Sequence, residues 1–85
     1  MLCRVIYPED KQYDTLTCSC CELSYTNKEY KILKDADRLA YFFSDEYGYF
    51  CHLCLMEYIK TNKESGENTP IIVKTKKGEI KLNEC

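Results

Sequence analysis

The chain has 85 residues, of which 45% are hydrophobic, and it contains only three Gly and two Pro. This composition predicts a single packed domain and excludes a disordered or low-complexity chain. A formal net charge of −2 and a pI of about 5.4 exclude a surface that is basic throughout, which is typical of nucleic-acid-binding domains.

Seven cysteines in so short a chain indicate metal or redox chemistry. The stretch 1–10 lacks the charged segment and long apolar core of a signal peptide, and no apolar run reaches the roughly 18 residues that a transmembrane helix needs. We therefore expect an intracellular, cytoplasmic protein that does not contact membranes and whose thiols stay reduced. A disulfide framework is the alternative, which the odd number of cysteines disfavours.

The first half of the chain is expected to consist of strands, turns and a loop. Residues 2–7 alternate as in a strand, with Cys3, Val5 and Tyr7 on one face. A second, short strand could pair back on the first one before the first cysteine group. The expected elements are a strand at 2–7, a turn at 8–11, a short strand at 13–17, a loop at 24–28, a strand at 30–33 and a turn at 34–38.

The second half is expected to hold an aromatic hairpin, one main helix and a second hairpin. Residues 36–43 have apolar side chains at helical spacing, but the three consecutive aromatic residues 41–43 favour a strand. Leu55, Met56 and Ile59 form the apolar stripe of the helix. The expected elements are a strand at 39–43, a turn at 44–48, a strand at 49–50, a helix at 52–63, a loop at 61–69, and strands at 70–75 and 79–82.

Two Cys-x2-Cys pairs are the most specific pattern in the sequence. Cys18 and Cys21 lie in an expected tight turn. After 29 further residues, Cys51 and Cys54 lie where a strand becomes a helix. A tight turn directs both sulfurs of a pair at one metal ion, and a helix N-terminus favours the thiolate form of cysteine. The pattern predicts one structural Zn²⁺ ion held by all four sulfurs.

Three neighbouring residues leave details of this site open. Glu22 follows the first pair at a position where glycine is often found, because glycine adopts the left-handed backbone conformation freely. Cys20 lies inside the first turn, where it could either fill space or replace a neighbour as a ligand. His52, the only histidine, could displace a cysteine, or it could be an exposed residue at the start of the helix.

The order of cysteine turn, hairpin and cysteine-bearing helix resembles the treble-clef zinc fingers over residues 18–63. The resemblance implies a small α+β fold with one main helix and two or three β-hairpins. It places a zinc-binding unit at 18–63 and a C-terminal hairpin at 70–82, within a single domain of residues 1–85. The segment between the two pairs is longer than in the simplest members of that family, which implies an extra strand looped out. A site closed by four thiolates leaves no position for substrate, so we expect no enzyme.

The segment from Phe50 to Cys54 also resembles the active site of thioredoxin-like proteins. That resemblance implies a thiol-disulfide oxidoreductase in which Cys51 is the nucleophile and Cys54 resolves the mixed disulfide. A strand beginning at Pro70 is similar to the proline-led strand of that family. However, only 15 residues separate Cys54 from Pro70, too few for the intervening strand and helix. This alternative also gives Cys18, Cys20 and Cys21 no role.

The absence of a catalytic constellation and the many tyrosines favour a small protein-interaction module or regulator that binds an unidentified protein. If the strands alternate, Phe42 and Phe50 point towards the helix. Tyr41 and Tyr49 are then left on the other face, where together with Tyr47 they are the expected partner-binding residues. The alternative partner is a nucleic acid, bound through the basic C-terminal hairpin and its Lys74, Lys76 and Lys77.

Overall fold

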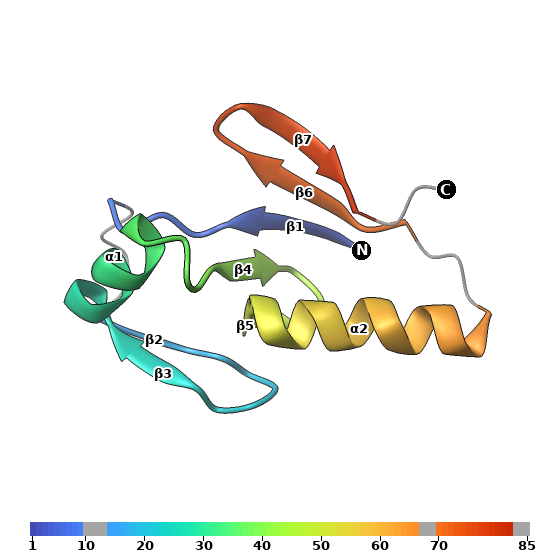
Figure 1. The fold of residues 1–85 in the computed structure, drawn as a ribbon, viewed down its shortest axis with the longest axis horizontal. Coiled ribbons are helices and arrows are strands. Elements are labelled where there is room, and N and C mark those ends of the chain that lie inside the picture. The colour runs from blue at the N-terminus through green and yellow to red at the C-terminus, as the bar shows by residue number, and fades with distance from the viewer. Residues whose placement is uncertain (10–13, 67–69, 83–85) are drawn as a thin grey trace.

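The structure, a computed structural model, describes residues 1–9, 14–66 and 70–82. In these residues the chain forms a small α+β fold with a five-stranded sheet, a separate two-stranded sheet and two helices (Figure 1). The elements in chain order are β1 (Leu2–Val5), β2 (Thr15–Thr17), β3 (Ser24–Thr26), α1 (Asn27–Asp35), β4 (Tyr41–Ser44), β5 (Gly48–Cys51), α2 (His52–Ser65), β6 (Ile72–Thr75) and β7 (Gly78–Lys81).

The first strand of the chain lies in the middle of the five-stranded sheet. The strand order is β5-β4-β1-β6-β7. β1 pairs with β4 in antiparallel fashion and with β6 in parallel fashion, whereas β4–β5 and β6–β7 are antiparallel hairpins. A parallel pair needs a long crossover, and here most of the chain separates β1 from β6. The C-terminal hairpin expected at 70–82 is therefore part of the main sheet.

Helix α2 packs on one face of this sheet. Phe42 and Phe50 pair across β4 and β5, with their ring centroids 5.6 Å apart. Phe50 also lines the same hollow as Leu55 of α2, and all three side chains are buried. Figure 1 shows α2 running alongside β4 from its start at the end of β5. The expected placement of Phe50 against the apolar stripe of the helix is confirmed.

At one end of the sheet, α1 and the β2–β3 pair cover the opposite face. Tyr41 shares this face with Cys51, its pairing partner. The buried Tyr30 hydroxyl of α1 donates to the Ile6 carbonyl oxygen at 2.6 Å and accepts from the Tyr41 amide at 3.0 Å. The Tyr41 hydroxyl in turn donates to the Leu23 carbonyl oxygen at 2.6 Å. These hydrogen bonds fix both the helix and the small sheet to the main sheet.

The loop expected at 24–28 and the strand expected at 30–33 are wrong, because this segment forms β3 and then α1. A capping box starts the helix: the Glu29 amide donates to Thr26 Oγ1 at 3.2 Å, and the Thr26 amide donates to Glu29 Oε1 at 3.0 Å. β3 supplies the partner of β2, which therefore does not pair back on β1. The described residues thus contain two helices where one main helix was expected.

The second half of the chain follows the sequence-based expectations more closely. The hairpins and α2 form where they are expected, although α2 continues to Ser65 and so includes part of the loop predicted at 61–69. Gly66 ends it with a left-handed φ of 75°. The predicted turn at 8–11, short strand at 13–17 and loop at 61–69 each fall partly outside the described residues. Neither helix in the described part of the chain is long and apolar enough to cross a membrane.

Candidate metal centre

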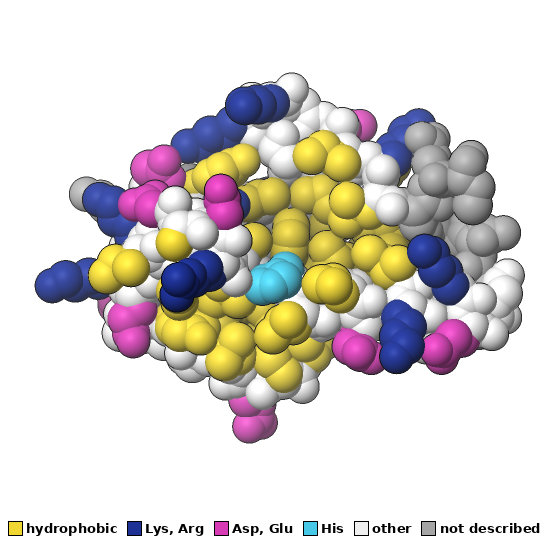
Figure 2. Space-filling view, in the orientation of Figure 1, with side chains coloured by type: hydrophobic (Ala, Val, Ile, Leu, Met, Phe, Trp, Pro, Cys, Tyr) yellow, Lys and Arg dark blue, Asp and Glu magenta, His cyan; other side chains and the backbone are white. Residues whose placement is uncertain are grey.

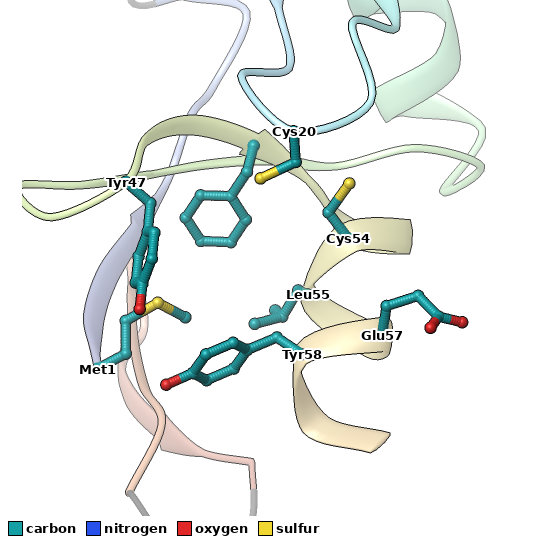
Figure 3. A pocket seen from close by; sticks show the side chains of 8 residues that line it. Met1, Cys20, Tyr47, Cys54, Leu55, Glu57 and Tyr58 are labelled. Carbon is teal, nitrogen blue, oxygen red and sulfur yellow. The ribbon is translucent and has the colours of Figure 1, made fainter. Parts of the chain in front are cut away.

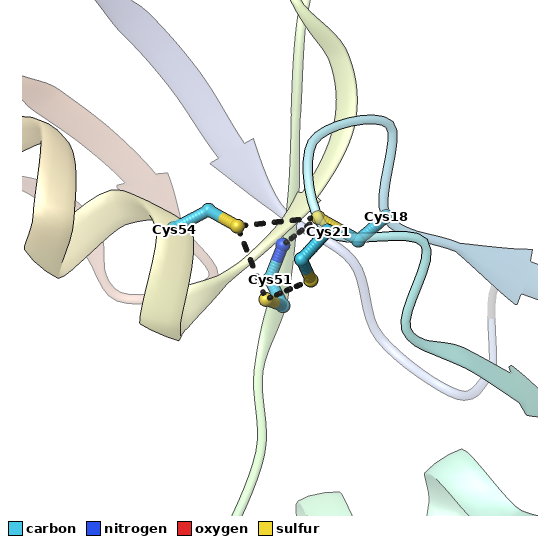
Figure 4. A group of neighbouring side chains, drawn as sticks. All are labelled: Cys18, Cys21, Cys51 and Cys54. Carbon is cyan, nitrogen blue, oxygen red and sulfur yellow. Dashed lines mark hydrogen bonds between the residues drawn. The ribbon is translucent and has the colours of Figure 1, made fainter.

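The four cysteines of the two Cys-x2-Cys pairs come together at one point of the fold (Figure 4). Cys18 and Cys21 lie in the turn between β2 and β3, Cys51 ends β5, and Cys54 lies in the first turn of α2. Their four sulfurs all lie within 4.8 Å of one another. The group can hold a metal ion and would then join the small sheet, the aromatic hairpin and the main helix.

The distances between the sulfurs suit a tetrahedral site. Cys18 Sγ is 3.5 Å from Cys54 Sγ, and Cys51 Sγ is 3.6 Å from Cys21 Sγ and 3.7 Å from Cys54 Sγ. Four sulfurs at about 2.3 Å from a central ion are separated by about 3.8 Å along the edges of a tetrahedron. A disulfide would instead bring two sulfurs to about 2.05 Å, and all four cysteines are free thiols. The arrangement therefore fits a shared ion better than paired disulfides.

The protonation of the group also favours a cation. Burial disfavours the thiolate of Cys18, but hydrogen bonds from backbone amides, that of Cys21 above all, outweigh it and lower the pKa to about 6. Burial, followed by the neighbouring Cys18 sulfur, raises the pKa of Cys54, and burial raises that of Cys51. One thiol thus ionises readily, whereas burial above all disfavours the thiolate forms of the other two. A bound cation removes this conflict because it stabilises every thiolate at once.

The backbone of the first turn takes the shape that a Cys-x2-Cys ligand pair needs. The Glu22 amide donates to the Cys18 carbonyl oxygen at 3.0 Å, and the Cys18 amide donates to the Leu23 carbonyl oxygen at 2.8 Å. Glu22 has a φ of 64°, so the left-handed conformation expected at this position is present although the residue is not glycine. The side chain of Cys18 is fully buried and that of Cys21 is exposed, which places the group at the edge of the core.

Neither Cys20 nor His52 belongs to the group of four. Cys20 is exposed in the same turn. The His52 amide donates to the Ala40 carbonyl oxygen at 2.9 Å, and the Ala40 amide donates to His52 Nδ1 at 3.3 Å. The histidine thereby ties the start of α2 to the chain just before β4. The Cys51 amide donates to Cys18 Sγ at 3.4 Å, so the second pair also supports the first through its backbone. Because all four sulfurs form one group, Cys18 and Cys21 are candidate metal ligands. The thioredoxin-like alternative gave these two residues no role.

The expected exposure of Tyr41 is wrong. Tyr41 and Tyr49 do lie on the same face of the sheet, as alternation predicts, but α1 and the small sheet cover the end that carries Tyr41. Its side chain is 0% exposed, and its ring packs edge-on against those of Tyr30 and Tyr25. Tyr41 is therefore a core residue that cannot offer its ring to a partner. Tyr47 is 45% exposed, so it stays a candidate.

The three lysines expected to form one basic patch have different surroundings. Lys76 Nζ lies 3.1 Å from Glu9 Oε1 and 4.3 Å from the centroid of the Tyr7 ring. Lys74 lies on β6 in register with Arg4 of β1, and Lys77 lies in the turn that follows. Part of the local positive charge is thus neutralised at the tip of the hairpin, and Lys74 belongs to the sheet face.

One row of side chains on that face could not be found from local sequence patterns. The strand register aligns one residue from each of the five strands: Tyr49, Phe43, Arg4, Lys74 and Glu79. The rings of Phe43 and Tyr49 have centroids 5.0 Å apart, and the Arg4 guanidinium lies 5.2 Å from the centre of the Phe43 ring. Among the described residues, neither cation of the row forms an ion pair. The row joins aromatic and basic side chains that are far apart in the sequence.

Comparison of the chain with protein-family models, with curated proteins and with solved structures found no match.

Proposed function

We propose that the four cysteines bind one Zn²⁺ ion and that the chain is a treble-clef-like zinc finger. The convergence of the four sulfurs from a cysteine turn, a hairpin and the start of a helix carries this proposal. Thiolates select soft metals, and a tetrahedral set of four sulfurs is typical of zinc or iron. Zinc supplies no redox chemistry, and four protein ligands fill its coordination sphere. Its role is to hold the fold together.

The function that best suits such a closed site is binding to another protein. Figure 2 shows hydrophobic side chains gathered across the middle of one face, with most charged side chains towards its edges. Several large apolar residues are more than two-fifths exposed, including Leu53 and Met56 of α2 and Ile80 of β7. Contiguous exposed apolar surface of this kind marks interaction sites in small soluble proteins. These features support a zinc-stabilised protein-interaction module.

Affinity capture with a matched metal-site variant tests this function. The zinc-loaded chain is expected to retain a specific protein from nuclease-treated extract, and that protein, once purified, should bind the chain at a fixed stoichiometry. Cys51→Ser should weaken this binding at least tenfold, because the hairpin and helix lose their common anchor. Lys77→Ala, an exposed residue outside the cysteine group, is the control and should bind normally. Equal binding by Cys51→Ser, or capture that nuclease abolishes, would contradict the proposal.

A second candidate function is binding of single-stranded nucleic acid on the open sheet face. The row from Tyr49 to Glu79 supports it, because single strands are bound by aromatic rings that stack on bases and by cations that contact phosphates. Arg4 and Lys74 stand side by side in register, and Glu79 pairs with Lys74 on the next strand, so two adjacent cations with one neighbouring carboxylate line this part of the face. This candidate nucleic-acid-binding surface is the open sheet face, whereas the sequence suggested the basic C-terminal hairpin.

Fluorescence anisotropy with labelled oligothymidine over a range of salt concentrations tests the second function. Replacing both Arg4 and Lys74 with Ala should reduce the slope of log K against log salt by about 1.4, the value for two phosphate contacts with a single strand. Lys77→Ala removes a lysine outside the row and should leave the slope unchanged. If the native chain does not bind the oligonucleotide even at low salt, this candidate function is excluded.

A further inference from the structure

An apolar pocket lies between α2, the β4–β5 turn and the start of β1 (Figure 3). Its volume is about 250 Å³. Phe50 and Leu55 are buried and contribute apolar wall, and Tyr47 and Tyr58 stand beside them. Figure 3 shows the two tyrosines reaching into the same region from the hairpin and from the helix. The pocket is thus built in part from elements that the cysteine group joins.

Contacts within the protein support the walls of the pocket. The Tyr47 and Tyr58 rings pack edge-to-face with centroids 6.0 Å apart. The Tyr47 amide donates to Ser44 Oγ at 2.9 Å, which holds the turn that carries the ring. Cys54 lines the pocket and also belongs to the group of four sulfurs, so a metal ion would immobilise one wall. A preformed pocket loses less conformational entropy on binding than a flexible one.

The size of the pocket limits what it can hold. An engineered cavity of about 150 Å³ can hold benzene, whereas pockets for drug-sized ligands have about 300–1,000 Å³. At about 250 Å³, the pocket accommodates a single aromatic ring with its linking carbon atoms. The walls provide apolar and aromatic surface for such a ring, and buried aromatic anchors dominate the energetics of many protein interfaces.

The charges around the pocket are mainly negative. Glu57 is the only charged side chain of the described residues that lines it, and Figure 3 shows this side chain on the outer side of α2, where its carboxylate meets solvent. Glu46 precedes Tyr47 in the chain and, after the nearby Tyr58 hydroxyl and burial, contributes to raising the pKa of Tyr47. The Met1 amino group is a nearby positive charge that donates a hydrogen bond to the neutral Pro70 carbonyl oxygen, and the two carboxylates outnumber it. A zinc ion with four thiolates adds a net charge of about −2 beside Cys54.

We infer that this pocket receives an aromatic side chain of a protein partner, presented on a segment in which Lys or Arg flanks the aromatic residue. This inference rests on the proposed protein-binding function and specifies its partner. The aromatic ring packs against Phe50, Leu55 and the tyrosines, while the flanking cations lie near Glu57 and Glu46. Cations can also contact the exposed faces of tyrosine rings, which adds to the preference for a basic segment.

Three short peptides test both parts of the inference by NMR titration of the zinc-loaded chain. The probes are acetyl-Arg-Phe-Arg-amide, acetyl-Glu-Phe-Glu-amide and acetyl-Arg-Ala-Arg-amide. The first should bind and shift the signals of Tyr47, Leu55 and Tyr58. The other two should each bind at least tenfold more weakly, because one reverses the charge and the other lacks the ring. Equal binding of the first two probes would overturn the charge preference, and equal binding of the first and third would overturn the aromatic anchor.

Matched variants identify the binding site. They also distinguish failure of the pocket inference from failure of the proposed protein-binding function. Tyr47→Ala should weaken the first peptide at least fivefold, and Glu57→Gln should reduce its preference over the acidic peptide. Thr61→Ala is the control, since Thr61 lies on α2, is exposed and does not line the pocket. Zinc content is measured on every sample. If a zinc-loaded chain captures its protein partner but shows no shifts at the pocket with the first peptide, the pocket inference is wrong and the proposed function stands.

Discussion

Removal of the metal is expected to abolish the cooperative unfolding transition of this protein. Structural zinc contributes an apparent free energy on the order of 10–16 kcal/mol in finger peptides, whereas the core of so small a domain supplies only about 3–5 kcal/mol. The cysteine group joins the β2–β3 turn, β5 and α2. Without the ion, no cation stabilises the thiolates of buried residues such as Cys18 and Cys51. The β2–β3 turn, β5 and α2 are then no longer linked through the metal.

Thermal unfolding followed by circular dichroism, with and without a strong chelator, measures this effect. The metal-loaded protein should melt in one transition, and the chelated protein should show little or none. Cys54→Ser should resemble the chelated protein, while Cys20→Ser, the control, should melt like the native chain because Cys20 lies outside the group. An unchanged melting curve after complete removal of the metal would show that the core alone stabilises the fold.

Tyr41→Ala is expected to destabilise the protein by about 3–5 kcal/mol, the cost typical of removing a large aromatic side chain from a core. Tyr41 is fully buried, and its ring touches those of Tyr25 and Tyr30. Its hydroxyl donates to the Leu23 carbonyl oxygen, which holds the small sheet against the main one. A loss of this size approaches the whole stability of many domains, about 5–15 kcal/mol.

Urea unfolding of a matched series separates the contributions of Tyr41. Tyr41→Phe keeps the ring and loses only the hydrogen bond, so it should cost about 0.5–1.5 kcal/mol. Tyr49→Ala removes a half-buried ring from the uncovered part of the same face and should cost clearly less than Tyr41→Ala. If Tyr41→Ala and Tyr49→Ala were equally mild, Tyr41 would not be the core residue that its burial indicates.

The cysteine group could be predicted from the sequence because its information is local. Each Cys-x2-Cys pair fixes its own geometry within four residues, and the hairpin and α2 that carry the second pair are marked by aromatic strand residues and a helical apolar stripe. The prediction of the four cysteine ligands did not depend on how the rest of the chain packs. For the same reason the order of turn, hairpin and helix was predictable, although the added helix α1 was not predicted.

The errors have identifiable physical causes. Thr26 and Glu29 form a capping box, a signal that marks a helix start and that strand propensity at 30–33 obscured. Alternation placed Tyr41 on the correct face, but it could not show that α1 covers this face, because that contact joins distant parts of the chain. The parallel pairing of β1 with β6, which aligns Arg4 with Lys74, is likewise a long-range contact without a local sequence signal.

The most direct test of the account is the number of zinc ions bound per chain, measured by elemental analysis of protein purified without chelator. We expect one zinc per chain and negligible iron. Changing any of the four cysteines to Ser should reduce the zinc content strongly, whereas Cys20→Ser should retain it. A native chain with well under half an equivalent of zinc, or a Cys18→Ser variant that keeps its zinc while Cys20→Ser loses it, would contradict the proposed centre.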